Sequence, residues 1–229
     1  MTHVLDPAQR RAAMIKAGLW QDKTLLDHFG AVVAATPDKL ALIAPRAESG
    51  TETRFTFREL DRLSDELAIG LQRRGVGEGD VVSFQLPNWW HFTVLHLACL
   101  KLGAISNPLM VIFRERELTF MLGLAETKVL IVPAKFRGVD HRAIALGVKA
   151  ALPGLQHVFM VDGEGEEDVA TLFAKDADQL KQATKVLQRC DLPGHRHDDM
   201  RALFVGDHVG QFFSIGADHE NIKTLLRHE

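Results

Sequence analysis

The chain has few of the features that mark several large protein classes. Only two cysteines, Cys99 and Cys190, occur among its 229 residues. Two thiols cannot build a disulfide framework, and such sparse use of cysteine fits a reducing, cytoplasmic setting. The formal net charge is −3, so no basic excess is available to neutralise phosphates. We therefore expect no nucleic-acid partner.

Long apolar runs are missing as well. The most apolar stretch, residues 94–113, is interrupted by charged and polar side chains and by Pro108, so we expect no membrane span. Residues 1–17 carry basic side chains but no continuous apolar core, which argues against a secretory signal. Hydrophobic residues make up 46% of the chain and charged residues 25%. This balance is ordinary for a globular protein that can bury a core.

The first part of the chain predicts two helices followed by a hairpin. A leading helix is expected over residues 7–17, and Gly18 ends it in a left-handed turn. Thr24 has the position of a cap for a second helix, which stops before a proline. Two short strands, residues 40–44 and 54–56, flank a polar segment. Their spacing predicts a small hairpin with a loose loop.

Strands and helices alternate in the next part of the chain. Thr56 and Glu59 have the spacing of a capping box, and the helix that they start ends at Gly75. Strands are then expected over residues 81–86, 104–106, 129–132 and 157–161, and helices over residues 89–102 (capped by Asn88), 115–125 and 140–152. This alternation predicts an α/β fold with a mostly parallel sheet, right-handed crossovers and helices on its faces.

The pattern changes after Asp162. Residues 163–168 form an acidic, glycine-containing loop, and residues 169–190 have a helical pattern that Leu192-Pro193-Gly194 breaks. We therefore divide the chain into an amino-terminal subdomain, residues 1–162, and a divergent helical or irregular tail, residues 163–229.

Several segments resemble, in the same order, the motifs of one enzyme family. They are residues 55–60 (Phe-Thr-Phe-Arg-Glu-Leu), 77–82, 86–88, 100–109, 113–118 and 136–138. The first resembles an aromatic-Thr-aromatic-x-Glu-Leu signature, and residues 100–109 resemble a helix end that runs into a strand and an asparagine-proline loop. Over residues 22–162 the chain is similar to the amino-terminal part of adenylate-forming, AMP-binding acyl-CoA synthetases, near the ligases for short-chain, medium-chain or alicyclic acids.

This resemblance implies an incomplete amino-terminal subdomain of a ligase. Intact members use a carboxylic acid, ATP, Mg²⁺ and coenzyme A to make an acyl-adenylate and then a thioester. Their Ser/Thr/Gly-rich phosphate loop ends in Pro-Lys-Gly, and no segment of this chain has that pattern. We therefore transfer no catalytic, cofactor-binding or metal-binding residue to this sequence, and we expect no cofactor for this chain alone.

Three functional hypotheses follow from a ligase pattern without its phosphate loop. In the first, the chain is a truncated or frameshifted ligase, altered near residue 163, that is inactive alone. In the second, it is one subunit of a split ligase and a second chain supplies the missing loop. In the third, it is a non-catalytic binding or regulatory module that keeps the half-fold for protein contact or for a homo-oligomer.

Some residues have both a functional and a structural interpretation. Gly75, Gly77 and Gly79 could cradle a phosphate, but they precede a strand, so a helix cap and turn is favoured. Trp89 and Trp90 could line an acyl pocket. Adjacent helical residues point about 100° apart, so we expect at least one of them to pack against the sheet.

The remaining candidates are weighed in the same way. Residues 114–117 could contact a substrate or a partner domain, although a solvated first helical turn is favoured. Residues 107–113 are the best place for a pocket contact, because ligands favour the carboxyl ends of parallel strands. We expect Cys99 to be an inert core thiol. The histidines near the end of the chain lack the spacing of a zinc site; they are His195, His197, His208, His219 and His228.

Overall fold

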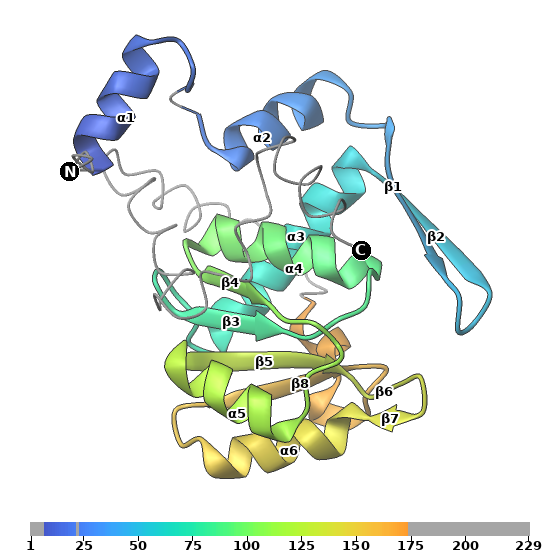
Figure 1. Ribbon diagram of the computed structural model, residues 1–229. Coiled ribbons are helices and arrows are strands. Elements are labelled where there is room, and N and C mark those ends of the chain that lie inside the picture. The colour runs from blue at the N-terminus through green and yellow to red at the C-terminus, as the bar shows by residue number, and fades with distance from the viewer. Residues whose placement is uncertain (1–6, 22, 174–229) are drawn as a thin grey trace, which may run out of the picture.

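The computed structural model describes residues 7–21 and 23–173 of the chain. A four-stranded sheet lies at the centre, with the strand order β4-β3-β5-β8 (Figure 1). Its strands are β3 (Val81–Phe84), β4 (Ile105–Pro108), β5 (Thr127–Pro133) and β8 (His157–Val161). These strands pair in parallel throughout, as helical crossovers require. The parallel α/β sheet predicted from the sequence is confirmed.

Helices cover both faces of this sheet (Figure 1). The pair on one face is α3 (Phe57–Arg73) and α4 (Trp90–Leu102), and the pair on the other is α5 (Glu115–Leu124) and α6 (His141–Ala151). Successive residues of β5 point to opposite faces. Ile131 therefore joins the hydrophobic cluster under α3 and α4, whereas Leu130 joins the cluster under α5 and α6.

Helix α3 begins where the sequence predicts. The Thr56 hydroxyl accepts a hydrogen bond from the Glu59 N–H at 3.3 Å, and the Thr56 N–H donates to the Glu59 carboxylate at 2.7 Å. These bonds satisfy helical donors that have no partner within the helix. Leu60, Leu67 and Leu71 then recur on the buried face, so the amphipathic spacing directs α3 onto the sheet.

The two helices at the start of the chain also follow the prediction. Helix α1 (Pro7–Lys16) is followed by Gly18 with φ 71°. Helix α2 (Leu25–Ala35) is capped by Thr24, whose side chain accepts from the Asp27 N–H at 3.2 Å. None of the residues in α2 is buried, so it lies on the outside of the described fold.

The first hairpin is longer than the sequence predicts. Strand β1 (Leu40–Arg46) pairs antiparallel with β2 (Thr51–Thr56), whereas the sequence predicted strands over residues 40–44 and 54–56. The loose loop expected between them is a tight turn, in which Gly50 donates to the Arg46 carbonyl at 2.9 Å. Cross-strand hydrogen bonding extends the ladder into polar residues, which the apolar spacing did not indicate.

A second hairpin was missed from the sequence. Strands β6 (Lys135–Phe136) and β7 (Val139–Asp140) pair antiparallel. The turn between them holds Arg137 at φ 47° and Gly138 at φ 78°. Two consecutive residues with positive φ are typical of the turns that close tight hairpins.

The predicted cap of helix α4 is wrong. The residue at the cap position is Trp89, and its side chain makes no capping hydrogen bond. Asn88 lies one position too early and is exposed, so its amide does not reach the first helical N–H groups. The other end is as predicted, since Gly103 ends α4 in the left-handed conformation with φ 69°.

The segment after Asp162 continues onto the same core as far as it is described. Residues 165–167 and 169–172 form short 3-10 turns, η1 and η2. Val169 and Leu172 are 3% and 1% exposed and belong to the cluster under α3 and α4. The helix predicted from residue 169 therefore starts as a 3-10 turn. Its remainder, and the break at 192–194, lie outside the described residues, so a boundary at 162/163 stays a prediction.

Candidate functional site

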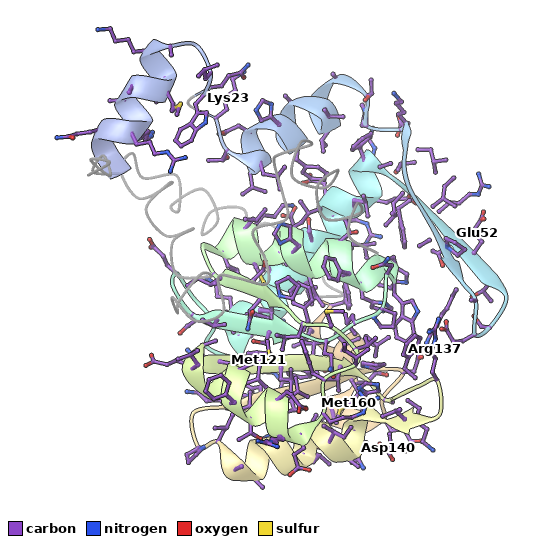
Figure 2. All side chains as sticks on the ribbon, viewed as in Figure 1. Lys23, Glu52, Met121, Arg137, Asp140 and Met160 are labelled. Carbon is purple, nitrogen blue, oxygen red and sulfur yellow. The ribbon has the colours of Figure 1, made fainter. Side chains whose placement is uncertain are left out.

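The carboxyl ends of β3, β5 and β8 meet at one edge of the sheet. Ligands bind at this edge in open parallel sheets. The β1–β2 hairpin reaches toward the same edge, on the right of Figure 1. Figure 2 labels Arg137 and Asp140 in the β6–β7 segment and Met160 near the carboxyl end of β8. Two groups of polar side chains lie there, one built around Gln85 and the other around Arg46.

The Gln85 group fixes the loop that follows β4. Gln85 comes directly after β3 and is 0% exposed. Its amide nitrogen donates to the carbonyls of Met110 at 2.8 Å and Phe113 at 3.0 Å. Its amide oxygen lies 3.1 Å from His141 Nδ1, and this nitrogen must carry the proton because the amide oxygen can only accept. Burial lowers the pKa of His141, so the ring is neutral near pH 7.

The Gln85 group determines which polar groups of the loop at residues 107–113 are already hydrogen-bonded. The backbone carbonyls of Met110 and Phe113 are already bound by Gln85, while the Met110 and Ile112 side chains are exposed. A ligand contact in this loop stays a prediction. Residues 114–117 are all exposed, and the Glu117 carboxylate accepts from the Arg114 N–H at 3.1 Å. The solvated first turn favoured by the sequence is confirmed.

The Arg46 group joins the tip of β1 to the end of β8. We use the name Arg46 cluster for Arg46, Trp89, His91 and Asp162. The Arg46 guanidinium binds both carboxylate oxygens of Asp162, with one contact at 3.1 Å. Its carbon atom Cζ lies 3.9 Å above the centre of the Trp89 ring. The hydrogen bond from Arg46 lowers the pKa of Asp162, so the pair is fully charged near neutral pH.

Trp89 and Trp90 both pack within the protein. Trp89 is 6% exposed and meets Phe136 edge-on, with ring centres 5.9 Å apart. Trp90 stacks on His91 at 3.6 Å and contacts Phe55 at 5.4 Å. The expectation that at least one tryptophan has a packing role is confirmed, because both rings lie in aromatic contacts that favour offset or edge-on geometry.

Two nitrogen atoms of the Arg46 cluster are buried without a hydrogen-bond partner in the described structure. They are Arg46 Nε and His91 Nδ1. Burial lowers the pKa of His91 to about 4, and the nearby Arg46 charge acts in the same direction, whereas Asp162 opposes it. The imidazole is therefore neutral near pH 7 and can offer a hydrogen bond.

The glycine cluster before β3 is a turn. Gly75 and Gly79 have φ values of 81° and 77°, and the Gly77 N–H donates to the Asp80 carboxylate at 2.8 Å. The Gly75 and Gly79 N–H groups donate to the carbonyls of Gln72 and Gly103, each at 2.9 Å. All three glycine amides are therefore already bonded, and the structural interpretation is confirmed. Cys99 is fully buried, and burial raises the pKa of its thiol to about 12. It is the inert core thiol that the sequence predicts.

Two further findings concern a metal site and a membrane-spanning helix, neither of which the sequence predicts. Within residues 7–21 and 23–173, no group of three His, Cys, Asp or Glu side chains is arranged to hold a metal ion. The candidate histidines lie outside this part; they are His195, His197, His208, His219 and His228. The helices of the described part are all too short or too polar to span a membrane.

Sequence reasoning did not single out Gln85, His91, His141, Arg46 or Asp162. A signal existed for part of this set. Gln85 and Asp162 each come directly after a buried strand, and such positions meet at the ligand-binding edge of a parallel sheet. For the other residues the sequence carries no local pattern, because their partners are distant in the chain.

Comparisons with known proteins agree on one family. The family model described as "AMP-binding enzyme" matches residues 29–203. The medium-chain fatty-acid–CoA ligase of Escherichia coli is 38% identical over 67% of this chain and 26% of that protein. The 2,3-dihydroxybenzoate-AMP ligase of Bacillus subtilis is 33% identical over 66% of this chain and 27% of that protein.

Solved structures give the same result. The apo structure of MbtA from Mycobacterium smegmatis matches 74% of this chain and 30% of that chain, with a TM-score of 0.63 and 30% identity. A putative long-chain-fatty-acid CoA ligase from Rhodopseudomonas palustris matches 68% of this chain and 37% of that chain, with a TM-score of 0.58 and 29% identity.

The chain spans only part of the length of these relatives, which limits the properties that the matches assign to it. The chain spans 26% of the Escherichia coli ligase and 38% of a naphthoate–CoA ligase from Streptomyces carzinostaticus. The family match also runs past residue 162, where the sequence pattern changes. Because the match covers most of the chain and the parallel sheet with its helices has the same fold, this chain belongs to the family of AMP-binding enzymes.

Proposed function

We propose that this chain supplies the amino-terminal subdomain of an ATP-dependent carboxylic acid–CoA ligase and that it forms no acyl-adenylate or thioester alone. The observation that carries the proposal is the family fold combined with the missing phosphate loop: no segment of the 229 residues is Ser/Thr/Gly-rich and ends in Pro-Lys-Gly. The division into residues 1–162 and 163–229 and a cytoplasmic location, which the sparse use of cysteine supports, are parts of this proposal.

Two paired cations of the described part, Arg46 and Lys101, do not fit ATP with Mg²⁺ or coenzyme A. Phosphoryl transfer needs cations and N–H donors that are free to face the phosphates. The Arg46 guanidinium is already paired with Asp162. The Lys101 ammonium contacts Asp61 at 2.8 Å and Asp65 at 2.6 Å. These charges hold the fold together, so we derive no reaction step through them. In the intact ligase the carboxylic acid, ATP and coenzyme A would be substrates.

The test is an assay of the purified chain. It would be incubated with ATP, Mg²⁺, coenzyme A and a set of short-chain, medium-chain and alicyclic acids, and pyrophosphate and thioester would be measured. We expect neither product above the level of a protein-free blank, whereas the Escherichia coli medium-chain ligase forms both under the same conditions. Thioester made by the purified chain would contradict the proposal.

A second candidate function is that of one subunit in a split ligase. The observation that favours it is the two-sided apolar character of α5. Leu118 and Leu122 are buried against the sheet, while Phe120 and Leu124 are 64% and 47% exposed on the outer side. A helix that is apolar on opposite sides is typical of one packed between two layers. The outer side of α5 is therefore a docking surface for a second layer.

The two candidate functions are distinguished by what binds to this docking surface. The chain would be mixed with a separately expressed ligase segment that carries the phosphate loop, and complex formation and thioester synthesis would be measured. Restored activity that Phe120→Ser abolishes supports the split ligase. No complex favours the inactive subdomain. Self-association through the same face, measured by analytical ultracentrifugation, instead favours a binding module that works as a homo-oligomer.

A further inference from the structure

The β1–β2 hairpin is a separate two-stranded sheet that does not pair with the central sheet. Its root is tied to the start of α3. The Phe57 N–H donates to the Lys39 carbonyl at 3.1 Å, and the Arg58 N–H donates to the Pro37 carbonyl at 2.9 Å. These backbone bonds hold the root, because they continue directly into a capped helix.

The middle of the hairpin touches the core through two half-buried side chains, Leu42 and Phe55, which pack against the cluster under α3 and α4. Ala44 is the one residue of β1 and β2 that is buried, and Ile43 is 46% exposed. An isolated two-stranded ribbon is marginally stable in water. On its outer side Arg54 pairs with Glu52 at 2.7 Å, and both side chains are largely exposed. Such a pair adds little to the free energy of unfolding.

The tip of the hairpin is held by one side chain. Arg46 binds Asp162 at the end of β8 and lies over the Trp89 ring at the start of α4. Trp89 in turn meets Phe136 of β6. One guanidinium thus connects the hairpin directly to two other segments, and to β6 through the Trp89 ring. It can do so because a planar guanidinium forms a bidentate bond in its plane and stacks on a ring with its face.

Asp162 connects this contact to the segment that follows β8. Its φ is 59°, a conformation that non-glycine residues adopt rarely. The chain then turns through residues 165–167 and places Val169 and Leu172 against α3. The Asp162 side chain is 58% exposed and the Arg46 side chain 26% exposed, so water and salt can reach the ion pair.

We propose that the β1–β2 hairpin is a strap across the carboxyl edge of the sheet, fastened at its tip by Arg46. When Arg46 leaves Asp162, the tip moves away from Trp89 while the root and the central sheet stay folded. The opened state uncovers the Trp89 ring and the unpartnered Nδ1 of His91 at the edge where parallel sheets bind ligands. This inference does not depend on the ligase activity of the chain.

The test compares the full chain with matched variants. Arg46→Ala and Asp162→Asn remove the fastening, and Arg54→Ala is the control, since it removes an exposed ion pair from the same hairpin. Amide hydrogen exchange would follow residues 42–52 and the core strand β5, and hydroxyl-radical footprinting would follow oxidation of Trp89. For Arg46→Ala we expect at least about tenfold faster exchange at the tip and about threefold more Trp89 oxidation, with β5 unchanged.

Two further measurements make the result independent of any single variant. In the unmodified chain, raising the salt concentration to about 1 M should speed exchange at the tip, because salt screens an accessible ion pair. The charge swap Arg46→Asp with Asp162→Arg should slow tip exchange relative to either single change. Tip exchange in Arg46→Ala equal to that in Arg54→Ala would overturn the proposal. So would a matching rise in β5, which would mean that the whole subdomain had loosened.

Discussion

At the scale of single residues, Gly70 sets how the last described segment packs. It lies inside α3, and a Cβ atom built at this position would come within 1.8 Å of the Leu172 carbonyl oxygen. That oxygen is backbone, so it can move only if the whole η2 turn moves. The absence of a side chain at Gly70 is therefore what allows Leu172 to reach the core.

Gly70→Ala should lower the free energy of unfolding by about 1–3 kcal/mol, the usual range for overpacking. The gain in helix propensity that alanine brings, about 1 kcal/mol, opposes this loss. Chemical denaturation would measure the change. Gly30→Ala is the matched control, because Gly30 is also helical and nothing lies within 4 Å of its Cβ position. We expect Gly30→Ala to be neutral or stabilising, and a stabilising Gly70→Ala would contradict the prediction.

His91 makes stability depend on pH. Burial lowers its pKa from 6.5 to about 4 in the folded chain. Between these values the unfolded chain binds a proton at His91 and the folded chain does not, so folding loses stability as the pH falls from 6.5 toward 4. Above pH 6.5 the effect is absent. The loss reaches about 3–4 kcal/mol at most, since one pKa unit corresponds to about 1.4 kcal/mol.

His91→Gln should therefore flatten the dependence of the unfolding free energy on pH. Denaturation curves of the two proteins would be compared from about pH 7 to about pH 4.5, within the range where the folded and unfolded pKa values differ. The pKa values of His96, His141 and His157 are also lowered by burial, and these residues are present in both proteins. Equal slopes for the two proteins would show that His91 is not the residue responsible.

At the scale of elements, the helix caps show which local sequence signals predict the structure correctly and which do not. Thr56 caps α3 with its hydroxyl, whereas Asn88 is exposed and makes no cap for α4. Thr56→Ala should lower the free energy of unfolding by about 1 kcal/mol. Asn88→Ala should change it by less than about 0.5 kcal/mol, as is usual for surface positions. Urea denaturation of both variants checks this, and equal losses would restore Asn88 as a cap.

The central sheet and the β1–β2 hairpin also differ in how well the local sequence predicts the bounds of their strands. The central strands are apolar and lie next to helices with clear spacing, so residues 129–132 and 157–161 were predicted close to their observed bounds. The ends of β1 and β2 carry polar residues, which pair across the two strands as far as Arg46 and Thr51. No apolar alternation marks them, and the prediction stopped short.

At the scale of the whole molecule, the exposed side of α5 predicts behaviour in solution. Replacing Phe120 and Leu124 together by serine should leave the thermal midpoint nearly unchanged and reduce dye binding to apolar surface. Leu122→Ala on the buried side is the contrast, with an expected loss of about 2–5 kcal/mol. A large loss of stability in the double serine variant would mean that this side of α5 is not a free surface.

The sequence by itself determined the α/β class, the parallel sheet, most helix boundaries and the family. These follow from signals that act over a few residues, such as the Thr56–Glu59 capping box and the left-handed Gly103, or from motifs in a fixed order. Hydrophobic spacing then dictates which side of each helix meets the sheet, because burying apolar surface is the main driving force of folding.

Only the tertiary structure decided which polar groups meet. Arg46 and Asp162 are 116 positions apart, and Gln85 and His141 are 56 positions apart. Neither pair has a spacing or pattern in the sequence that would identify it. A polar side chain at the end of a strand can pair with many different residues or remain exposed to solvent. The contacts exist because the sheet places Gln85 and Asp162 at the carboxyl ends of its strands, and the folding of the β1–β2 hairpin and of α6 brings Arg46 and His141 to them.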